Sequence, residues 1–297
     1  MSFATGKSTI HYVARRVQRM SLEADFDVAE RLLGGDGAPQ VASQPIIRNP
    51  RTVIALVGMA FEARIAAGPG IHVFSRDARD ELETLVASAS RHGYRGIISF
   101  GVAGGLAERL RPGDWVVASA VIGADETRPT HSVWSRNILA AITGAHHAPV
   151  IGVDTPVADP ARKRELRGLT GAAAVDMESH VVAKLAAEHG LAFTALRVIV
   201  DPADRAIPRA ALAGMGAGPR ADGAAVMRDL LARPAQLPLL VRVSLDAYIA
   251  RCAMQRARRR LGPHFAFTEP GLAGLMSSAD AADDLAVAAA ASHRSPA

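Results

Sequence analysis

Two acidic residues in the second half of the chain stand where α/β proteins bind their ligands. Glu178 opens a helix pattern over residues 179–189, and Asp201 follows a strand predicted over residues 191–200. Ligands of open α/β sheets bind beside the carboxyl ends of strands, where carboxyl groups can bind hydroxyls or transfer protons. Each acid also has a purely structural explanation. Glu178 could stabilise the start of a helix through the helix dipole, and Asp201 before Pro202 could form a turn.

Two further strand ends carry unusual residues. Glu62 lies shortly after a continuous apolar strand over residues 52–57, and a glycine-rich run over 101–105 follows a strand predicted over 96–100. Glycines let a backbone approach a ligand and present N–H groups, although this run lacks the spacing of a dinucleotide fingerprint. The alternatives are a solvated charge for Glu62 and a tight strand-to-helix turn for the glycines. We expect these strand ends and the two acids to converge on one crevice, because neighbouring strands of one sheet end together.

The elements that must position these residues have the periodicity of an α/β protein. Apolar runs typical of buried strands alternate with helix patterns, the clearest of which cover residues 77–91, 179–189 and 234–261. We therefore expect an α/β fold, a three-layer α/β/α sandwich with a mixed central sheet. Residues 202–222 are rich in Ala, Gly and Pro and are predicted to be a loop. The predicted organisation is an N-terminal extension and linker over 1–50, an α/β domain over 51–232, a basic C-terminal helix over 233–264 and a disordered tail over 265–297.

The basic composition has two explanations. The net charge of +5 comes almost wholly from arginine, because the only lysines are Lys7, Lys163 and Lys184. A bias toward arginine and alanine explains this balance as well as a functional basic surface does. We therefore expect no nucleic-acid partner.

Other features exclude several classes of site. The single cysteine, Cys252, rules out an internal disulfide and a cysteine-based metal cluster. The histidines have no recognisable ligand spacing with acids, so no metal is expected. The sequence has neither a secretory signal nor an apolar stretch of about 20 residues, which predicts a cytoplasmic protein.

Four motifs occur together between residues 52 and 232. They are the strand end Gly58 to Glu62, the run Phe100-Gly101-Val102-Ala103-Gly104-Gly105-Leu106, the run Val175-Asp176-Met177-Glu178, and the run Arg197-Val198-Ile199-Val200-Asp201-Pro202. In this order they resemble the purine nucleoside phosphorylase and nucleosidase superfamily. Together with Leu110-Arg111-Pro112-Gly113-Asp114 and the basic C-terminal helix, they are most similar to its hopanoid-associated phosphorylase group. The resemblance implies a phosphorylase/hydrolase-like sandwich, no organic cofactor and a homo-oligomer, usually a dimer.

The resemblance also assigns roles to individual residues. Asp201 matches the family's general acid, which protonates the departing purine, and Glu178 matches the residue that binds the ribose hydroxyls. The other substrate-binding positions that it implies are Met177 against the sugar, Val102, Ala103 and Gly104 along the base and ribose, and Val157 near the base.

The attacking group depends on a different set of residues. Glu62 matches the acid that positions water in nucleosidases, and a carboxylate at that place would repel phosphate. Phosphorolysis would need cationic or hydroxyl donors there, for which Ser75, Arg76 and Arg64 are the candidates, with inorganic phosphate as co-substrate. The loop over 74–77 departs from the family pattern because it has no glycine. We favour hydrolysis.

The resemblance implies release of adenine from an adenosyl substrate, with adenosylhopane of hopanoid biosynthesis as the leading candidate. A methylthioadenosine/S-adenosylhomocysteine nucleosidase is the alternative enzyme. A non-catalytic nucleoside-binding protein is the alternative of another class, and the altered loop over 74–77 supports it. The helix over 234–261 combines apolar residues with a dense arginine cluster. It is predicted either to contact the inner membrane peripherally or to pack on the sheet with its arginines solvated.

Overall fold

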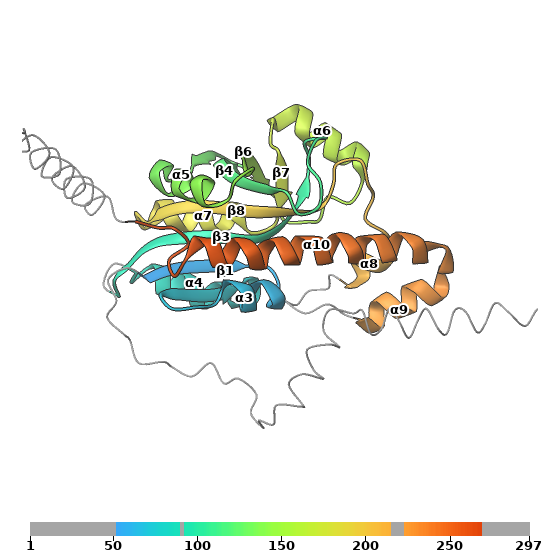
Figure 1. Cartoon of the computed structure of the whole chain (residues 1–297), viewed down its shortest axis with the longest axis horizontal. Helices are drawn as coiled ribbons and strands as arrows, with labels where there is room; N and C mark the ends of the chain where they lie inside the picture. Colours follow the sequence, from blue (N-terminus) through green and yellow to red (C-terminus); the bar gives the residue numbers. More distant parts are fainter. Residues whose placement is uncertain (1–51, 90–91, 215–222, 269–297) are drawn as a thin grey trace, which may run out of the picture.

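The structure is a computed structural model that describes residues 52–89, 92–214 and 223–268. The predicted extension over 1–50 and the part of the predicted tail beyond residue 268 lie outside the described residues. The described chain forms an eight-stranded mixed sheet with helices on both faces (Figure 1). In chain order the elements are β1 (Thr52–Val57), α3 (Ala60–Ala66), β2 (Ile71–Ser75), η1 (Arg76–Ala78), α4 (Arg79–Val86), β3 (Tyr94–Gly105), β4 (Trp115–Ile122), β5 (Thr127–Pro129), α5 (Ser132–Ala141), β6 (His146–Gly152), α6 (Pro160–Thr170), β7 (Ala174–Asp176), α7 (Ser179–Glu188), β8 (Ala192–Asp201), α8 (Arg209–Gly214), α9 (Gly223–Ala232), η2 (Pro234–Gln236) and α10 (Leu237–Leu261).

Strand pairing brings three chain segments to one end of β3. The sheet has the order β2-β1-β3-β7-β6-β4-β5, and β8 pairs with both β3 and β4. β8 runs parallel to β3 and antiparallel to β4, whereas β7 runs antiparallel to β3 and parallel to β6. The pairs β3–β7, β7–β6, β6–β4, β4–β8 and β8–β3 therefore close a ring. As a consequence, Gly104 of β3 has Val175 of β7 on one side and Asp201 of β8 on the other.

Side-chain alternation along the strands builds two large cores, one on each face of the sheet, beside a smaller cluster under α6. Ile54 and Leu56 of β1 belong to the core covered by α4 and α7, whereas Val53, Ala55 and Val57 belong to the core covered by α3, α5 and α10. Successive residues of a strand point to opposite faces, and a continuous apolar run therefore needs helices on both sides. This arrangement confirms the predicted α/β sandwich with a mixed central sheet.

The helix predicted over 234–261 is present as η2 followed by α10. Pro238 stands in the first turn of α10, where a proline costs no helical hydrogen bond, and Gly262 follows its last residue. One side of α10 is buried on the sheet through Ala250, Ala253 and Met254. None of the helices in the described part of the chain has the length and apolar character needed to cross a bilayer.

The glycine run over 101–105 was expected to follow the strand predicted over 96–100, but it is part of that strand. β3 continues through the glycines to Gly105, because the backbone there pairs with both β7 and β8. The segment over 202–222 was also predicted to be a loop, but it contains α8 among its described residues.

The helix predicted over 77–91 begins as η1 and ends earlier than expected, at Val86. After Val86 the backbone hydrogen bonds change from the spacing of four residues found in an α-helix to a spacing of three. Ser88 N–H donates to the Leu85 carbonyl, and Ala89 N–H donates to the Val86 carbonyl. The Ser88 hydroxyl binds the Leu85 carbonyl as well, and hydroxyl side chains that bond to local backbone oppose helix continuation.

Candidate active site

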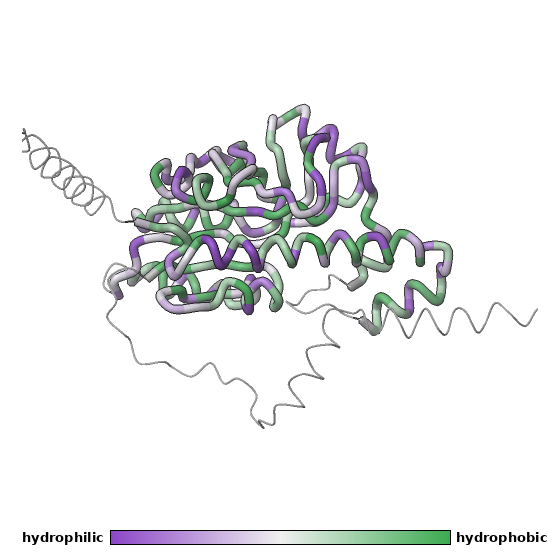
Figure 2. Tube along the Cα trace, viewed as in Figure 1, coloured by the Kyte–Doolittle hydropathy of each residue, from purple (hydrophilic) through white to green (hydrophobic). Residues whose placement is uncertain are grey.

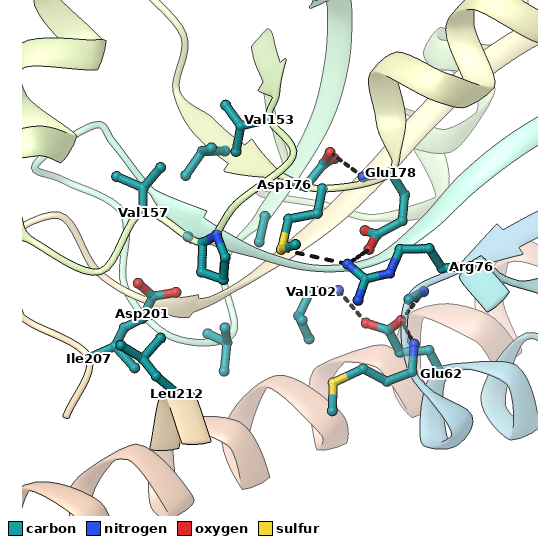
Figure 3. A pocket seen from close by; sticks show the side chains of 18 residues that line it. Glu62, Arg76, Val102, Val153, Val157, Asp176, Glu178, Asp201, Ile207 and Leu212 are labelled. Carbon is teal, nitrogen blue, oxygen red and sulfur yellow. Dashed lines mark hydrogen bonds and ion pairs between the residues drawn. The ribbon is translucent and has the colours of Figure 1, made fainter. Parts of the chain in front are cut away.

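The predicted strand ends surround one cavity of about 380 Å³ at the end of β3. Figure 3 shows Asp201 at one end of this cavity and Glu62, Glu178 and Arg76 at the other. Apolar side chains, including Val153, Val157, Ile207 and Leu212, form much of the wall between and beside them. The lining residues are Gly58, Met59, Glu62, Arg76, Val102, Ala103, Gly104, Val153, Pro156, Val157, Val175, Asp176, Met177, Glu178, Val200, Asp201, Ile207 and Leu212.

Glu62 is a buried acid held by three backbone N–H groups. Its Oε2 accepts hydrogen bonds from Gly58 N and Met59 N, both at 2.8 Å, and its Oε1 accepts one from Val102 N at 2.7 Å. The bond from Met59 completes a capping box at the start of α3, so the side chain also has a structural role. A carboxylate has about four acceptor sites, and these bonds leave one of them for a ligand or a water molecule.

Burial raises the pKa of Glu62 from 4.5 to about 7. The negative charge of Glu178 adds to this effect, while the N–H of Val102 and the guanidinium of Arg197 oppose it. Near neutral pH, Glu62 can therefore both accept and release a proton.

Glu178 and Asp176 share the buried guanidinium of Arg197. Arg197 Nε lies 2.6 Å from Asp176 Oδ2, and Arg197 Nη1 lies 3.5 Å from Glu178 Oε2. Asp176 also accepts from Ser179 N at 2.9 Å and so anchors the start of α7. Burial raises the pKa of Glu178, although Arg197 opposes the rise. Arg197 Nη1 is buried without a hydrogen-bond partner among the described residues, and its nearest acidic group is the Glu178 carboxylate of this ion pair.

Glycines are required where these acids approach the backbone. A Cβ atom on Gly58 would lie 2.8 Å from Glu178 Oε1, and a Cβ on Gly101 would lie 2.7 Å from both Glu62 Oε1 and Arg197 Nη1. A Cβ on Gly104 would lie 3.2 Å from Asp201 Oδ1. In β3, Gly101 and Gly104 therefore leave room for charged side chains close to the backbone.

Asp201 of strand β8 is held by a buried lysine of helix α6. Lys163 of α6 is fully buried, and its ammonium group bonds to Asp201 Oδ2, to the Pro202 carbonyl at 2.9 Å and to the Arg205 carbonyl at 3.2 Å. Its three N–H bonds are thereby all used. Burial raises the pKa of Asp201, and the charge of Lys163 opposes the rise. Because Lys163 binds Oδ2, the other oxygen, Oδ1, is left to face a ligand.

The three candidates for phosphate binding are not brought together. Arg76 lines the cavity, where its guanidinium lies 3.6 Å from Glu178 Oε1 and 3.8 Å from Met177 Sδ. Ser75 ends β2 and does not line the cavity. Arg64 is exposed in the last turn of α3, and it does not line the cavity either. Of the three candidates, Arg76 is the one that lines this cavity, and a phosphate-binding role for Ser75 and Arg64 stays a prediction.

The structure brings the other predicted site residues together and adds some that the sequence did not identify. Glu62, Met177, Glu178 and Asp201 line the same cavity, as do Val102, Ala103, Gly104 and Val157. The sequence analysis did not identify Lys163 as a site residue. Two features could have indicated it: lysine is rare in this arginine-rich chain, and Lys163 lies one helical turn before the apolar Leu166. Ile207 and Leu212 were missed because their segment was predicted to be a loop. Within the described ranges, no group of three or more His, Cys, Asp and Glu side chains could hold a metal ion.

Comparison with known proteins identifies the fold family. Residues 75–213 match the family model described as Phosphorylase superfamily. This segment of the chain is therefore similar in sequence to the phosphorylase superfamily. No curated protein has significant sequence similarity to the chain.

Solved structures similar to this chain include a futalosine hydrolase and two nucleosidases. Futalosine hydrolase of Helicobacter pylori strain 26695 has 17% identity and a TM-score of 0.51, over 72% of this chain and 97% of that chain. The 5'-methylthioadenosine/S-adenosylhomocysteine nucleosidase of S. pneumoniae, solved with a transition-state inhibitor, has 14% identity and a TM-score of 0.50, over 72% of this chain and 98% of that chain. The corresponding nucleosidase of Helicobacter pylori has 15% identity and a TM-score of 0.50, over 71% of this chain and 96% of that chain. At these identities the likeness establishes a shared fold.

Proposed function

We propose that the protein cleaves the N-glycosidic bond of an adenosyl compound by hydrolysis and releases adenine. The observation that carries this proposal is the arrangement of Asp201 at one end of the cavity and of Glu62 and Glu178 at the other. A nucleoside lying between them would have its base near Asp201 and its ribose near the two glutamates. The names of the similar solved structures, a futalosine hydrolase and two methylthioadenosine/S-adenosylhomocysteine nucleosidases, also favour this reaction class.

In the proposed reaction Asp201 acts as the leaving-group acid. Protonated at Oδ1, it donates this proton to N7 of the purine as the bond between C1' of the ribose and N9 breaks. Glu178 accepts hydrogen bonds from the ribose hydroxyls and holds the sugar while positive charge develops on it. Glu62 takes one proton from a water molecule, and the oxygen of that water forms the new bond to C1'. The products are adenine and the sugar, which now carries a hydroxyl group at C1'.

Water is favoured over phosphate because of the charges near the ribose end of the cavity. Glu62 and Glu178 are both buried there, and a phosphate beside them would face two carboxyl groups. Arg76 is the arginine among the lining residues, and it already lies 3.6 Å from Glu178. A phosphate-binding site would need more donors than this.

Adenosylhopane is the leading substrate within this proposal, which would assign the protein to hopanoid biosynthesis. Ile207 and Leu212 make part of the cavity wall apolar, and an apolar wall suits a substrate that carries an apolar substituent. Methylthioadenosine and S-adenosylhomocysteine are smaller adenosyl compounds that the same acids would process, so a nucleosidase for these compounds is the second candidate.

Adenine release tests the proposal directly. The purified full chain is incubated with methylthioadenosine, S-adenosylhomocysteine or detergent-solubilised adenosylhopane, each with and without phosphate. We expect release from at least one compound without phosphate, and its loss in the Asp201→Asn variant. The matched control is Asp154→Asn, which changes a highly exposed aspartate outside the cavity. A strict requirement for phosphate would refute hydrolysis. Binding of these nucleosides without any adenine release would favour the non-catalytic binding protein.

A further inference from the structure

The outward side of α9 and α10 exposes several large apolar side chains. Val241, Leu245, Tyr248 and Ile249 of α10 are between 38% and 57% exposed, and Leu231 of α9 is 73% exposed. Leu239 in the first turn of α10 is 52% exposed as well, but it lies on the same helix face as the buried Ala250 and Ala257. Figure 2 shows these hydrophobic segments along the helices at one end of the molecule. The only other large apolar side chain of comparable exposure among the described residues is Leu169. The exposed apolar residues are therefore concentrated on one pair of helices, which marks an interaction surface.

The same side of α10 is strongly basic. Its exposed arginines are Arg242, Arg256, Arg259 and Arg260. Residues 237–261 contain a single acid, Asp246, and this side chain is buried and bonded to Arg205 at 2.7 Å. The exposed side of α10 thus presents apolar groups and arginines without an exposed carboxylate. We call this side, with Leu231, the α10 surface.

We propose that the α10 surface docks on an anionic lipid bilayer. Aliphatic side chains can enter the boundary between headgroups and acyl chains, while arginines remain at the level of the negative headgroups. A second copy of the chain fits less well, because a symmetric contact through α10 would bring two sets of arginines together. A nucleic acid would satisfy the arginines but would leave the aliphatic side chains without a partner.

Docking at this surface would place the border of the cavity close to the bilayer. The segment that contributes Ile207 and Leu212 is joined to α10 by the ion pair between Arg205 and Asp246. It is joined to η2, directly before α10, by a hydrogen bond from Ala210 N to Gln236 Oε1 at 3.2 Å. A cavity border near the bilayer would suit the apolar substrate of the proposed function. The docking proposal itself does not rest on that function, because it is argued from the exposed side chains of α10.

Vesicle flotation tests the proposal without using an enzyme assay. The full chain is mixed with vesicles of phosphatidylglycerol and phosphatidylcholine, or of phosphatidylcholine alone, at low and high salt. We expect binding to the anionic vesicles at low salt and weaker binding at high salt, because added salt screens the headgroup charge. Two variants probe the α10 surface separately: Leu245→Gln with Ile249→Gln, and Arg256→Gln with Arg259→Gln and Arg260→Gln.

We expect the triple arginine variant to bind anionic vesicles on the order of a hundred-fold more weakly, since each arginine near the headgroups contributes about five-fold. The double apolar variant should lose most of its binding as well. The control for the apolar variant is Leu169→Gln. The control for the arginine variant is Arg109→Gln with Arg162→Gln and Arg164→Gln. All of these positions are exposed and lie outside α10. Thermal unfolding checks that every variant is folded.

Three outcomes would overturn the proposal. The first is failure of the wild-type chain to float with anionic vesicles. The second is binding that persists in both α10 variants, which would assign it to another part of the chain. The third is a concentration-dependent dimer in light scattering that Leu245→Gln with Ile249→Gln abolishes, which would make the surface a contact between copies. Adenine release is measured on the same samples, so that failure of lipid binding and failure of the proposed reaction are distinguished.

Discussion

The ion pair between Lys163 and Asp201 allows a quantitative test of the site through the variant Lys163→Met. Methionine fills a similar space but has no N–H groups, so Asp201, Pro202 and Arg205 each lose a hydrogen bond. Asp201 stays buried without its cation, and its pKa must therefore rise further above its usual value. Removing one partner of a buried pair typically costs about 3–5 kcal/mol of stability.

The pH dependence of this loss has a definite sign. Burial already raises the pKa of Asp201 above the unfolded value of 3.8, so the folded state holds this proton more tightly. The contribution of Asp201 to stability therefore falls as pH rises from 3.8 through its folded pKa. In Lys163→Met this decline continues to higher pH, and each further unit of pKa adds about 1.4 kcal/mol. The stability difference between the variant and the wild type should grow with pH and then level off.

The assays are urea unfolding across a pH series and kcat/KM for adenine release across the same series. If Asp201 is the acid, the alkaline limb of kcat/KM in Lys163→Met shifts to higher pH, while the maximum falls because the carboxyl group is less well oriented. The matched control is Lys184→Met, which removes an exposed lysine 3.9 Å from Glu188 and should change stability by less than about 1 kcal/mol. An unchanged alkaline limb and a pH-independent loss of stability would refute this account of Lys163.

The remaining predictions concern Glu62 and the glycine that faces it. Because the pKa of Glu62 is about 7 and its ionised form is the base, kcat/KM should rise with pH through about 7, and Glu62→Gln should lower the rate by about 10²-fold or more. Exposed Glu188→Gln serves as its control, and a normal rate in Glu62→Gln would exclude Glu62 as the base. The raised pKa of Glu62 also predicts that the free energy of unfolding falls by about 3 kcal/mol as pH rises from 4.5 to above 7, because the folded chain must release a proton that it binds tightly. Urea unfolding measures this fall, which should be absent in Glu62→Gln. Gly101→Ala places a Cβ 2.7 Å from Arg197 Nη1 and should destabilise the fold by about 1–3 kcal/mol, whereas Gly168→Ala, in a helix with open space around it, should stabilise it by up to about 1 kcal/mol. Thermal unfolding compares the two, and equal effects would contradict the close approach at Gly101.

The convergence of the acids could be predicted from the sequence because it follows from strand order along the chain. The apolar runs of β1 and β8 have the composition of buried strands, and parallel strands of one sheet end at a common edge. Glu62 and Asp201 follow those runs, so their approach to one crevice required no knowledge of individual contacts. The motif Asp176-Met177-Glu178 at the start of a helix added the third acid in the same way.

Short elements escaped prediction because distant partners stabilise them. β7 has three residues, and its strand conformation depends on pairing with β3 and β6 rather than on local propensity. The glycine run is part of β3 for the same reason. Its composition indicated a close approach to the backbone, but the groups that approach it are Glu62 and Arg197 of the protein itself.

The sequence by itself determined the α/β class, the strand ends that form the crevice and the acids that lie in it, since these depend on periodicity and chain order. Only the tertiary structure decided which charges face one another. Lys163 reaches Asp201 across 38 positions of sequence, and Arg197 reaches Glu178 across the sheet edge. Arg76, and not the nearby Arg64, enters the cavity because of the directions in which η1 and α3 leave their strands. Such contacts join residues that are distant in sequence. Their charges interact strongly only at separations of a few ångströms, and folding is what brings them that close.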